Sequence, residues 1–112
     1  MITMDILKEF GADTQEGLDR CLGNEDFYLK MVNMGIGDDK FEALGTALQN
    51  NDLDEAFELA HAIKGVLGNL ALTPIYEPAG EMTELLRTRT EMDYTQLYNK
   101  VMEERSRLLS MV

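Results

Sequence analysis

The chain has 112 residues and a net charge of −11, because 21 acidic residues outnumber 10 basic ones. This length matches one small domain, so we expect residues 1–112 to form a single domain. The acidic charge argues against binding to nucleic acid or to an anionic membrane, since both require a positive surface.

No apolar run approaches the roughly 20 residues that would span a bilayer. The first residues carry acids and no long apolar stretch, which is unlike a signal peptide. We therefore expect a soluble, cytoplasmic protein. Cys21 is the only cysteine, which agrees with a reducing compartment and leaves no partner for an internal disulfide. We expect it to be a small buried residue on a short helix. The absence of a CxxC pair and of a second histidine also argues against a closed zinc site within the chain.

The chain is rich in Leu, Met, Ala and Glu, has only two prolines, and lacks alternating β-branched runs, all of which favour helices. The spacing of apolar residues predicts short amphipathic helices at 4–10 and 15–22, each followed by a glycine that ends it. Asp13 or Thr14 can cap the second of these helices.

Asn24 is expected to cap a third helix, which opens with two acidic residues where the helix dipole favours them. The stretch GIGDDK at 35–40 weakens this helix, so we expect a kink or a restart at Asp38 before it runs to Asn50. Methionines at helical positions are expected to fill the core; they are Met31, Met34, Met82 and Met102.

The pattern then predicts a long helix at 53–72, capped by Asn51 or Asp52. The pair Thr73-Pro74 is a helix start signal, and the helix it begins is expected to run to about residue 88.

Pro78 predicts that this helix begins late or is distorted. Asp93 is expected to cap a last helix that ends near residue 109. Amphipathic helices with short connections predict an all-α fold, an antiparallel up-down four-helix bundle with short additional N-terminal helices.

The helix at 53–72 contains the only histidine, His61. At about 100° per residue, its apolar side chains share one third of the circumference and form the core stripe: Leu53, Ala56, Ala60, Ile63, Leu67 and Leu70. The opposite side, towards water, carries Glu55, Glu58, Ala62 and Asn69. The border between the two holds a set at helical i, i+3, i+4 and i+7 spacing: His61, Lys64, Gly65, Gly68 and Leu72.

Interior glycines lower helix stability by about 0.5–1 kcal/mol each relative to alanine, so fold stability does not explain Gly65 and Gly68. Close approach of another body does explain them, because glycine leaves the helix surface bare. The alternative is that they allow two helices of the bundle to pack closely. We interpret the stretch as an accessible imidazole, a neighbouring lysine and a docking groove.

The segment HAIKGVLGNLAL resembles the His-x-x-Lys-Gly motif of histidine phosphotransfer domains. The resemblance covers nearly the whole chain, because GADTQEGLDRCLGNEDFYLKMV is similar to the first helices of that family and NNDLDEAFELAHAIKG to its approach to the histidine. The family often has a glycine ten residues after the histidine, where this chain has Ala71. Alanine is also small, so docking is expected to be preserved.

The resemblance implies that His61 carries a phosphoryl group between the aspartates of receiver domains in a multistep phosphorelay. Lys64 can neutralise the phosphate oxygens, and Gly65, Gly68 and Leu72 would contact the docked partner. The implied partners are response-regulator receiver domains and a hybrid histidine kinase, and we expect a monomer. No GxxxxGK[ST] loop and no Gly-rich ATP-binding lid is present, so the chain should not phosphorylate itself from ATP. No cofactor is expected in the chain itself, and Mg²⁺ would come from the receiver.

Two other functions compete with this interpretation. Glu58 and His61 have the Glu-x-x-His spacing of di-iron bundles, but such sites need two of these motifs and the chain has one histidine. The second alternative is an interaction module that binds receiver domains through the same groove without transferring phosphate. The presence of His61 and Lys64 favours transfer over binding alone.

Overall fold

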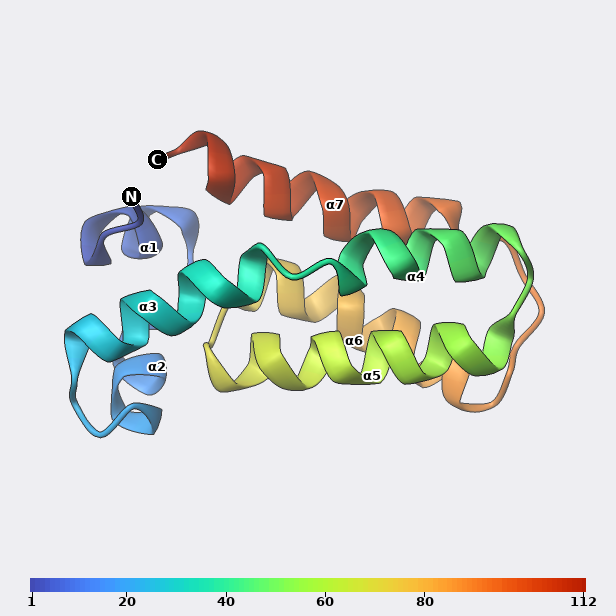
Figure 1. Ribbon diagram of the computed structural model, residues 1–112, viewed down its shortest axis with the longest axis horizontal. Helices are drawn as coiled ribbons and strands as arrows, with labels where there is room; N and C mark the ends of the chain where they lie inside the picture. The colour runs from blue at the N-terminus through green and yellow to red at the C-terminus, as the bar shows by residue number, and fades with distance from the viewer.

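The computed structural model describes residues 1–112, and all of its regular structure is helical (Figure 1). In chain order the helices are α1 (Met4–Phe10), α2 (Thr14–Arg20), α3 (Glu25–Ile36), α4 (Lys40–Gln49), α5 (Leu53–Asn69), α6 (Thr73–Arg87) and α7 (Thr95–Ser110). No helix is both long enough and apolar enough to cross a bilayer.

Helices α4 to α7 form the antiparallel bundle, and this confirms the predicted fold class. Figure 1 shows α3 and α4 following one another along one edge, with α5 running back beside them and α6 and α7 completing the bundle. Side chains tie α7 to α4 and to the end of α3: the Tyr98 hydroxyl donates to the Phe41 carbonyl of α4 at 3.0 Å, and Arg105 Nε donates to the Ile36 carbonyl of α3 at 2.6 Å. Within α4 to α7, each connection reverses the direction of the chain, so consecutive helices of the bundle are antiparallel.

Helices α1 to α3 pack over one end of the bundle, where α5 connects to α6. The buried Tyr28 hydroxyl donates to the Leu70 carbonyl at 2.8 Å, and the Asp13 amide donates to the Ala71 carbonyl at 3.0 Å. On the other side Arg107 of α7 donates to the Phe10 carbonyl at 3.0 Å. These contacts tie the short N-terminal helices to the bundle rather than leaving them as a separate unit.

The core draws on every helix, and its largest fully buried side chains include Tyr28, Phe41, Leu44, Leu67, Ile75, Met82, Leu86 and Leu108. Cys21 is buried and reduced, as expected. Of the predicted core methionines, Met82 is fully buried, and Met31 and Met102 pack partly against the core. The prediction for Met34 was wrong: this side chain is 60% exposed, because its helix turns it outward beyond the core-facing side.

The predicted interruption of the third helix is confirmed, since α3 ends at Ile36 and α4 begins at Lys40. Oδ1 of Asp38 accepts a hydrogen bond from the Lys40 amide at 2.8 Å, which satisfies a donor at the start of α4. At the start of α3, the Asn24 side chain caps the helix by accepting from the Phe27 amide at 3.0 Å, as predicted.

Helix α5 ends at Asn69, three residues before the predicted end at Leu72. Ala71 adopts a left-handed conformation with φ of 55°, its amide donates to the Gly68 carbonyl at 3.2 Å, and the Leu72 amide donates to the Leu67 carbonyl at 3.0 Å. This pair of bonds around a left-handed residue is the Schellman motif, in which the left-handed position is usually glycine. This chain has an alanine at that position, so the sequence did not predict that the helix ends at Asn69.

Helix α6 begins at Thr73, with Pro74 in its first turn as predicted, and continues unbroken to Arg87. The expectation that the helix begins only at Pro78 was therefore wrong. Pro78 lacks an amide donor and leaves the carbonyl one turn before it without that partner. Its ring is buried, so apolar packing offsets part of the lost hydrogen bond.

Candidate functional site

Helix α5 presents His61 on its exposed side. The core stripe of this helix is as predicted for Ala56, Ala60, Ile63 and Leu67, which are at most 3% exposed. The Asp52 side chain caps its first turn by accepting from the Glu55 amide at 3.1 Å. Because the apolar stripe fixes the rotation of α5, the imidazole four positions after the half-buried Phe57 is directed to solvent.

The His61 ring stacks on the ring of Phe57, with centroids 5.7 Å apart and an interplanar angle of 25°. The guanidinium groups of Arg87 and Arg89, at the end of α6, lie over the same Phe57 ring at 5.2 and 4.7 Å from its centroid. Such cation–π contacts fix cations close to an aromatic surface. The ring that supports the imidazole is thus also in contact with two cations, each of which pairs with a carboxylate: Arg87 with Glu84 at 3.2 Å and Arg89 with Asp54 at 2.6 Å.

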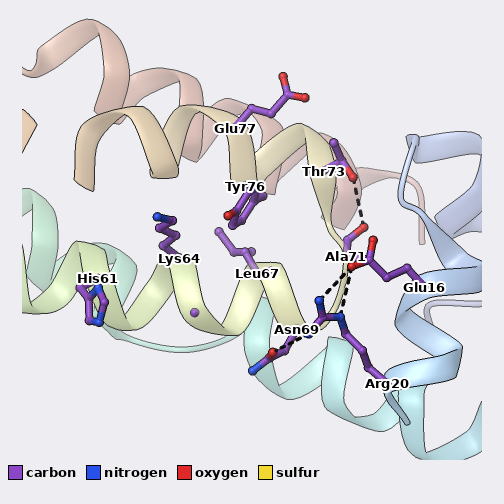
Figure 2. Close-up of a pocket in the computed structure, with 12 residues that line it drawn as sticks. Glu16, Arg20, His61, Lys64, Leu67, Asn69, Ala71, Thr73, Tyr76 and Glu77 are labelled. Atoms are coloured by element: carbon purple, nitrogen blue, oxygen red, sulfur yellow. Dashed lines mark hydrogen bonds and ion pairs between the residues drawn. The ribbon is translucent and has the colours of Figure 1, made fainter. Parts of the chain in front are cut away.

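Lys64 lies one turn further along α5, but its side chain points across to α6 rather than towards His61 (Figure 2). Its Nζ is 3.5 Å from Oε2 of Glu84, and the same oxygen lies 3.2 Å from Nη2 of Arg87. The hydrogen bond from Arg87, together with the charges of Arg87 and Lys64, holds the pKa of the Glu84 carboxyl below its usual value. Glu84 thus bridges the cations of Lys64 and Arg87.

The two glycines after His61 have different surroundings. A Cβ added at Gly65 would meet no atom within 4 Å, so this part of α5 is bare towards solvent. A Cβ added at Gly68 would stand 3.1 Å from Cε2 of Tyr76 on α6, which is a tight contact. Gly65 therefore fits the docking interpretation alone, whereas Gly68 also allows the α6 tyrosine to lie close to α5.

A groove of about 490 Å³ runs along this face from His61 to the end of α2 (Figure 2). It is lined by Glu16, Arg20, His61, Lys64, Gly65, Leu67, Gly68, Asn69, Ala71, Thr73, Tyr76 and Glu77. The structure thus brings together four of the five residues singled out in the sequence. Leu72 is the exception: it is fully buried at the start of α6, so its prediction as a docking residue was wrong. The helical wheel does not extend to Leu72, since α5 ends at Asn69.

Sequence reasoning missed the contributions of other helices to the groove. Arg20 of α2 lies at the far end, where Nη1 donates to Oδ1 of Asn69 at 3.4 Å and Nη2 pairs with Glu16 at 3.0 Å. Tyr76 and Glu77 line the α6 side. These residues are distant from His61 in the chain, and no spacing pattern relates them to it. For a separate contact, the stacking of His61 on Phe57, the sequence did hold a signal, because the two residues have the i, i+4 spacing of helical neighbours.

Residues 37–110 match the family model described as Hpt domain, and this match spans more than half of the chain. The chain therefore belongs to the Hpt, or histidine phosphotransfer, domain family, as the resemblance implied. Hpt domains are helical phosphoryl carriers of two-component phosphorelays, and they interact with receiver domains. No curated protein and no solved structure matches the chain significantly.

Proposed function

We propose that the protein is a phosphoryl carrier in a multistep phosphorelay and that His61 is the residue that carries the phosphoryl group. One observation supports this most directly. The only imidazole of the chain is exposed at one end of a groove, four residues before the bare surface at Gly65 and one turn before Lys64. It stacks on the Phe57 ring, which also carries the guanidinium groups of Arg87 and Arg89. Because Gly65 has no side chain, an aspartyl phosphate on a docked domain could approach the imidazole of His61 across this bare part of the helix.

In the proposed step, the lone pair of an unprotonated imidazole nitrogen of His61 attacks the phosphorus of the receiver's aspartyl phosphate. An N–P bond forms, the P–O bond to the aspartate breaks, and the aspartate leaves as a carboxylate. The other ring nitrogen keeps its proton. The reverse sequence on a second receiver returns the phosphoryl group to an aspartate. Imidazole suits this step, because one uncharged ring nitrogen has a lone pair that can attack phosphorus while the other ring nitrogen holds the proton.

The protein's part in such a step is to position groups and offset charge, since phosphoryl transfer needs little else from it. We assign the charge compensation to Lys64 and the docking surface to Gly65 and Gly68. Mg²⁺ and the acceptor carboxylate would be supplied by the receiver domain. We further propose that residues 1–112 act as one monomeric domain in the cytoplasm, and that a hybrid histidine kinase is the upstream source of phosphate.

The test is incubation with a phosphorylated receiver domain, followed by detection of acid-labile, alkali-stable phosphate on this chain. We expect label on the wild type and none on His61→Gln, a substitution that keeps side-chain length and suits an exposed helix position. Circular dichroism shows whether both proteins have the same helix content. Undiminished labelling of a folded His61→Gln protein would refute the assignment of His61.

A second arm omits the receiver and adds ATP and magnesium alone, and here we expect no label on either protein. Labelling under these conditions would mean that the chain contains a kinase site. Stable binding of receiver domains without any transfer of label would instead support the alternative of a docking module that carries no phosphate.

A further inference from the structure

Lys64 forms an ion pair with the Glu84 carboxylate and does not point towards the imidazole of His61. Figure 2 shows its side chain extending from α5 towards α6, while the His61 ring points elsewhere. The side chain passes close to Gly80 of α6, where an added Cβ would stand 3.8 Å from Lys64 Cε. Its end then lies 3.5 Å from Oε2 of Glu84. The Lys64 side chain is 26% exposed, against 46% and 55% for Lys40 and Lys100 in their ion pairs, so it lies against the helix rather than in solvent.

We propose that Glu84 is the resting counter-ion of Lys64, and that a phosphoryl group on His61 draws Lys64 away from Glu84 to the phosphoryl oxygens. This inference rests on the proposed function, because it requires phosphorylation of His61. The two α5 residues are three positions apart and therefore lie next to one another on the helix surface. A lysine has a long flexible stem, so a change of rotamer is enough to move its ammonium group between the two partners.

Charge favours this exchange. A phosphoryl group carries about −1.5 to −2 near neutral pH, whereas the Glu84 carboxylate carries a single negative charge. The Lys64–Glu84 contact is long at 3.5 Å, and the Glu84 side chain is 59% exposed. Ion pairs exposed to solvent contribute little to stability, so breaking this one has a small energetic cost.

Arg87 makes the exchange reversible without leaving a charge unpaired. Its Nη2 lies 3.2 Å from the Glu84 oxygen that also faces Lys64, and its guanidinium is held over the Phe57 ring. Glu84 therefore keeps a cationic partner when Lys64 leaves, and it is in place to take Lys64 back when the phosphoryl group is passed on. By competing for Lys64, Glu84 weakens the hold of the protein on the phosphoryl group and favours its onward transfer.

The experiment uses the complete chain and potassium phosphoramidate, a small donor that needs no receiver domain. Phosphoramidate phosphorylates an accessible imidazole by forming an N–P bond as its own N–P bond breaks and ammonia leaves. The ³¹P NMR signal of the modified protein, followed as pH is varied, reports the second acid dissociation constant of the phosphoryl group. A nearby ammonium group favours the dianion and so raises this constant.

Four proteins form a double-mutant cycle: wild type, Glu84→Gln, Lys64→Gln and the double variant. We expect Glu84→Gln to raise the dissociation constant about two- to fivefold when Lys64 is present, the range set by exposed ion pairs, and to have a clearly smaller effect in Lys64→Gln. Glu84→Asp, which keeps the charge but shortens the side chain, should resemble Glu84→Gln. Glu103→Gln removes the same charge from an exposed site on α7 and should change nothing.

The possible results distinguish failure of the counter-ion role of Glu84 from failure of the proposed phosphorylation of His61. Equal effects of Glu84→Gln with and without Lys64 would show that Glu84 acts by its charge alone, and this would overturn its role as a counter-ion. The same conclusion would follow if Glu84→Asp behaved as wild type. If phosphoramidate fails to modify His61 in the wild type, while His61→Gln gives the same spectrum, then His61 is not an accessible nucleophile and the proposed function itself is refuted.

Discussion

The imidazole of His61 rests on the phenyl ring of Phe57, 5.7 Å away between centroids and inclined by 25°. The same phenyl ring carries the guanidinium groups of Arg87 and Arg89. Phe57 thus contacts both the imidazole and the two guanidinium groups at and just beyond the end of α6. Its half-buried position against the core makes it a rigid support for groups that are themselves exposed.

The substitution Phe57→Leu should separate this supporting role from simple packing. Leucine keeps an apolar contact with the core but loses the aromatic stack, worth about 0.5–1.5 kcal/mol, and the cation–π contacts, worth about 0.5–1 kcal/mol each when exposed. We expect the free energy of unfolding to fall by about 1.5–3.5 kcal/mol, the sum of one stack and two cation–π contacts. We also expect the rate of transfer from a receiver to fall up to about tenfold, because the imidazole is less well oriented.

Phe10→Leu is the matched control, since Phe10 lies beneath Arg107 in the same way, at 4.3 Å, but belongs to α1. It should lose stability in urea unfolding without losing transfer rate per folded molecule. Equal transfer rates in the two variants would mean that Phe57 contributes only to packing.

Gly65 and Gly68 should respond differently to enlargement. Gly65→Gln adds helix propensity, about 0.5–1 kcal/mol, at a position where a Cβ meets no atom within 4 Å. We expect its melting temperature to rise and receiver-dependent transfer to fall steeply. Gly68→Gln must displace the Tyr76 ring from 3.1 Å, so any gain in melting temperature should be smaller or reversed. A Gly65→Gln protein with full transfer activity would show that this surface does not meet the partner.

Ala71→Gly is expected to stabilise the protein, against the usual effect of this substitution. The left-handed conformation of Ala71 costs an L-residue about 1–2 kcal/mol, which exceeds the extra entropy that glycine loses on folding. We predict a gain of up to about 1 kcal/mol in urea unfolding. Ala47→Gly, in the interior of α4, should instead lose about 0.5–1 kcal/mol or more. A loss at both positions would show that the packing of the Ala71 methyl group outweighs its backbone strain.

Alkaline pH should weaken the attachment of α3 to the end of α5. Burial, with smaller contributions from Cys21 and Asp13, raises the pKa of the Tyr28 phenol to about 12. In the unfolded chain a tyrosine titrates near pH 10, so between about pH 10 and 12 the unfolded state releases a proton that the folded state keeps. Stability is therefore fully present below about pH 10 and is lost as pH rises, by about 2–3 kcal/mol in total.

Urea unfolding of wild type and Tyr28→Phe between pH 9 and about pH 12 measures this effect. The variant lacks the hydrogen bond to Leu70 at every pH but should lose less stability across the window. Burial also raises the pKa of Tyr94 and Tyr98, so part of the decline should persist in both proteins. Parallel curves would rule out Tyr28 as the source.

The local sequence pattern was sufficient to predict most of the helices and to predict which side of α5 faces the core. The apolar stripe through Ala60 and Ile63 has the period of a helix, and a periodic stripe is buried whatever it packs against. For that reason the exposure of His61 and the helical neighbourhood of Lys64 and Gly65 follow from their spacing alone. Caps such as Asn24 are equally local, because the side chain bonds an amide three residues away.

The sequence by itself thus determined an all-helical bundle and an exposed histidine beside a lysine and glycines. Only the tertiary structure decided that α5 stops before Leu72, that Lys64 faces Glu84, and that Arg20 closes the far end of the groove. The physical reason is the range of the interactions. Helix periodicity and caps act within one or two turns, whereas a groove and its ion pairs depend on which helices lie side by side, and many residues of an amphipathic helix satisfy the same pattern without sharing the same neighbour.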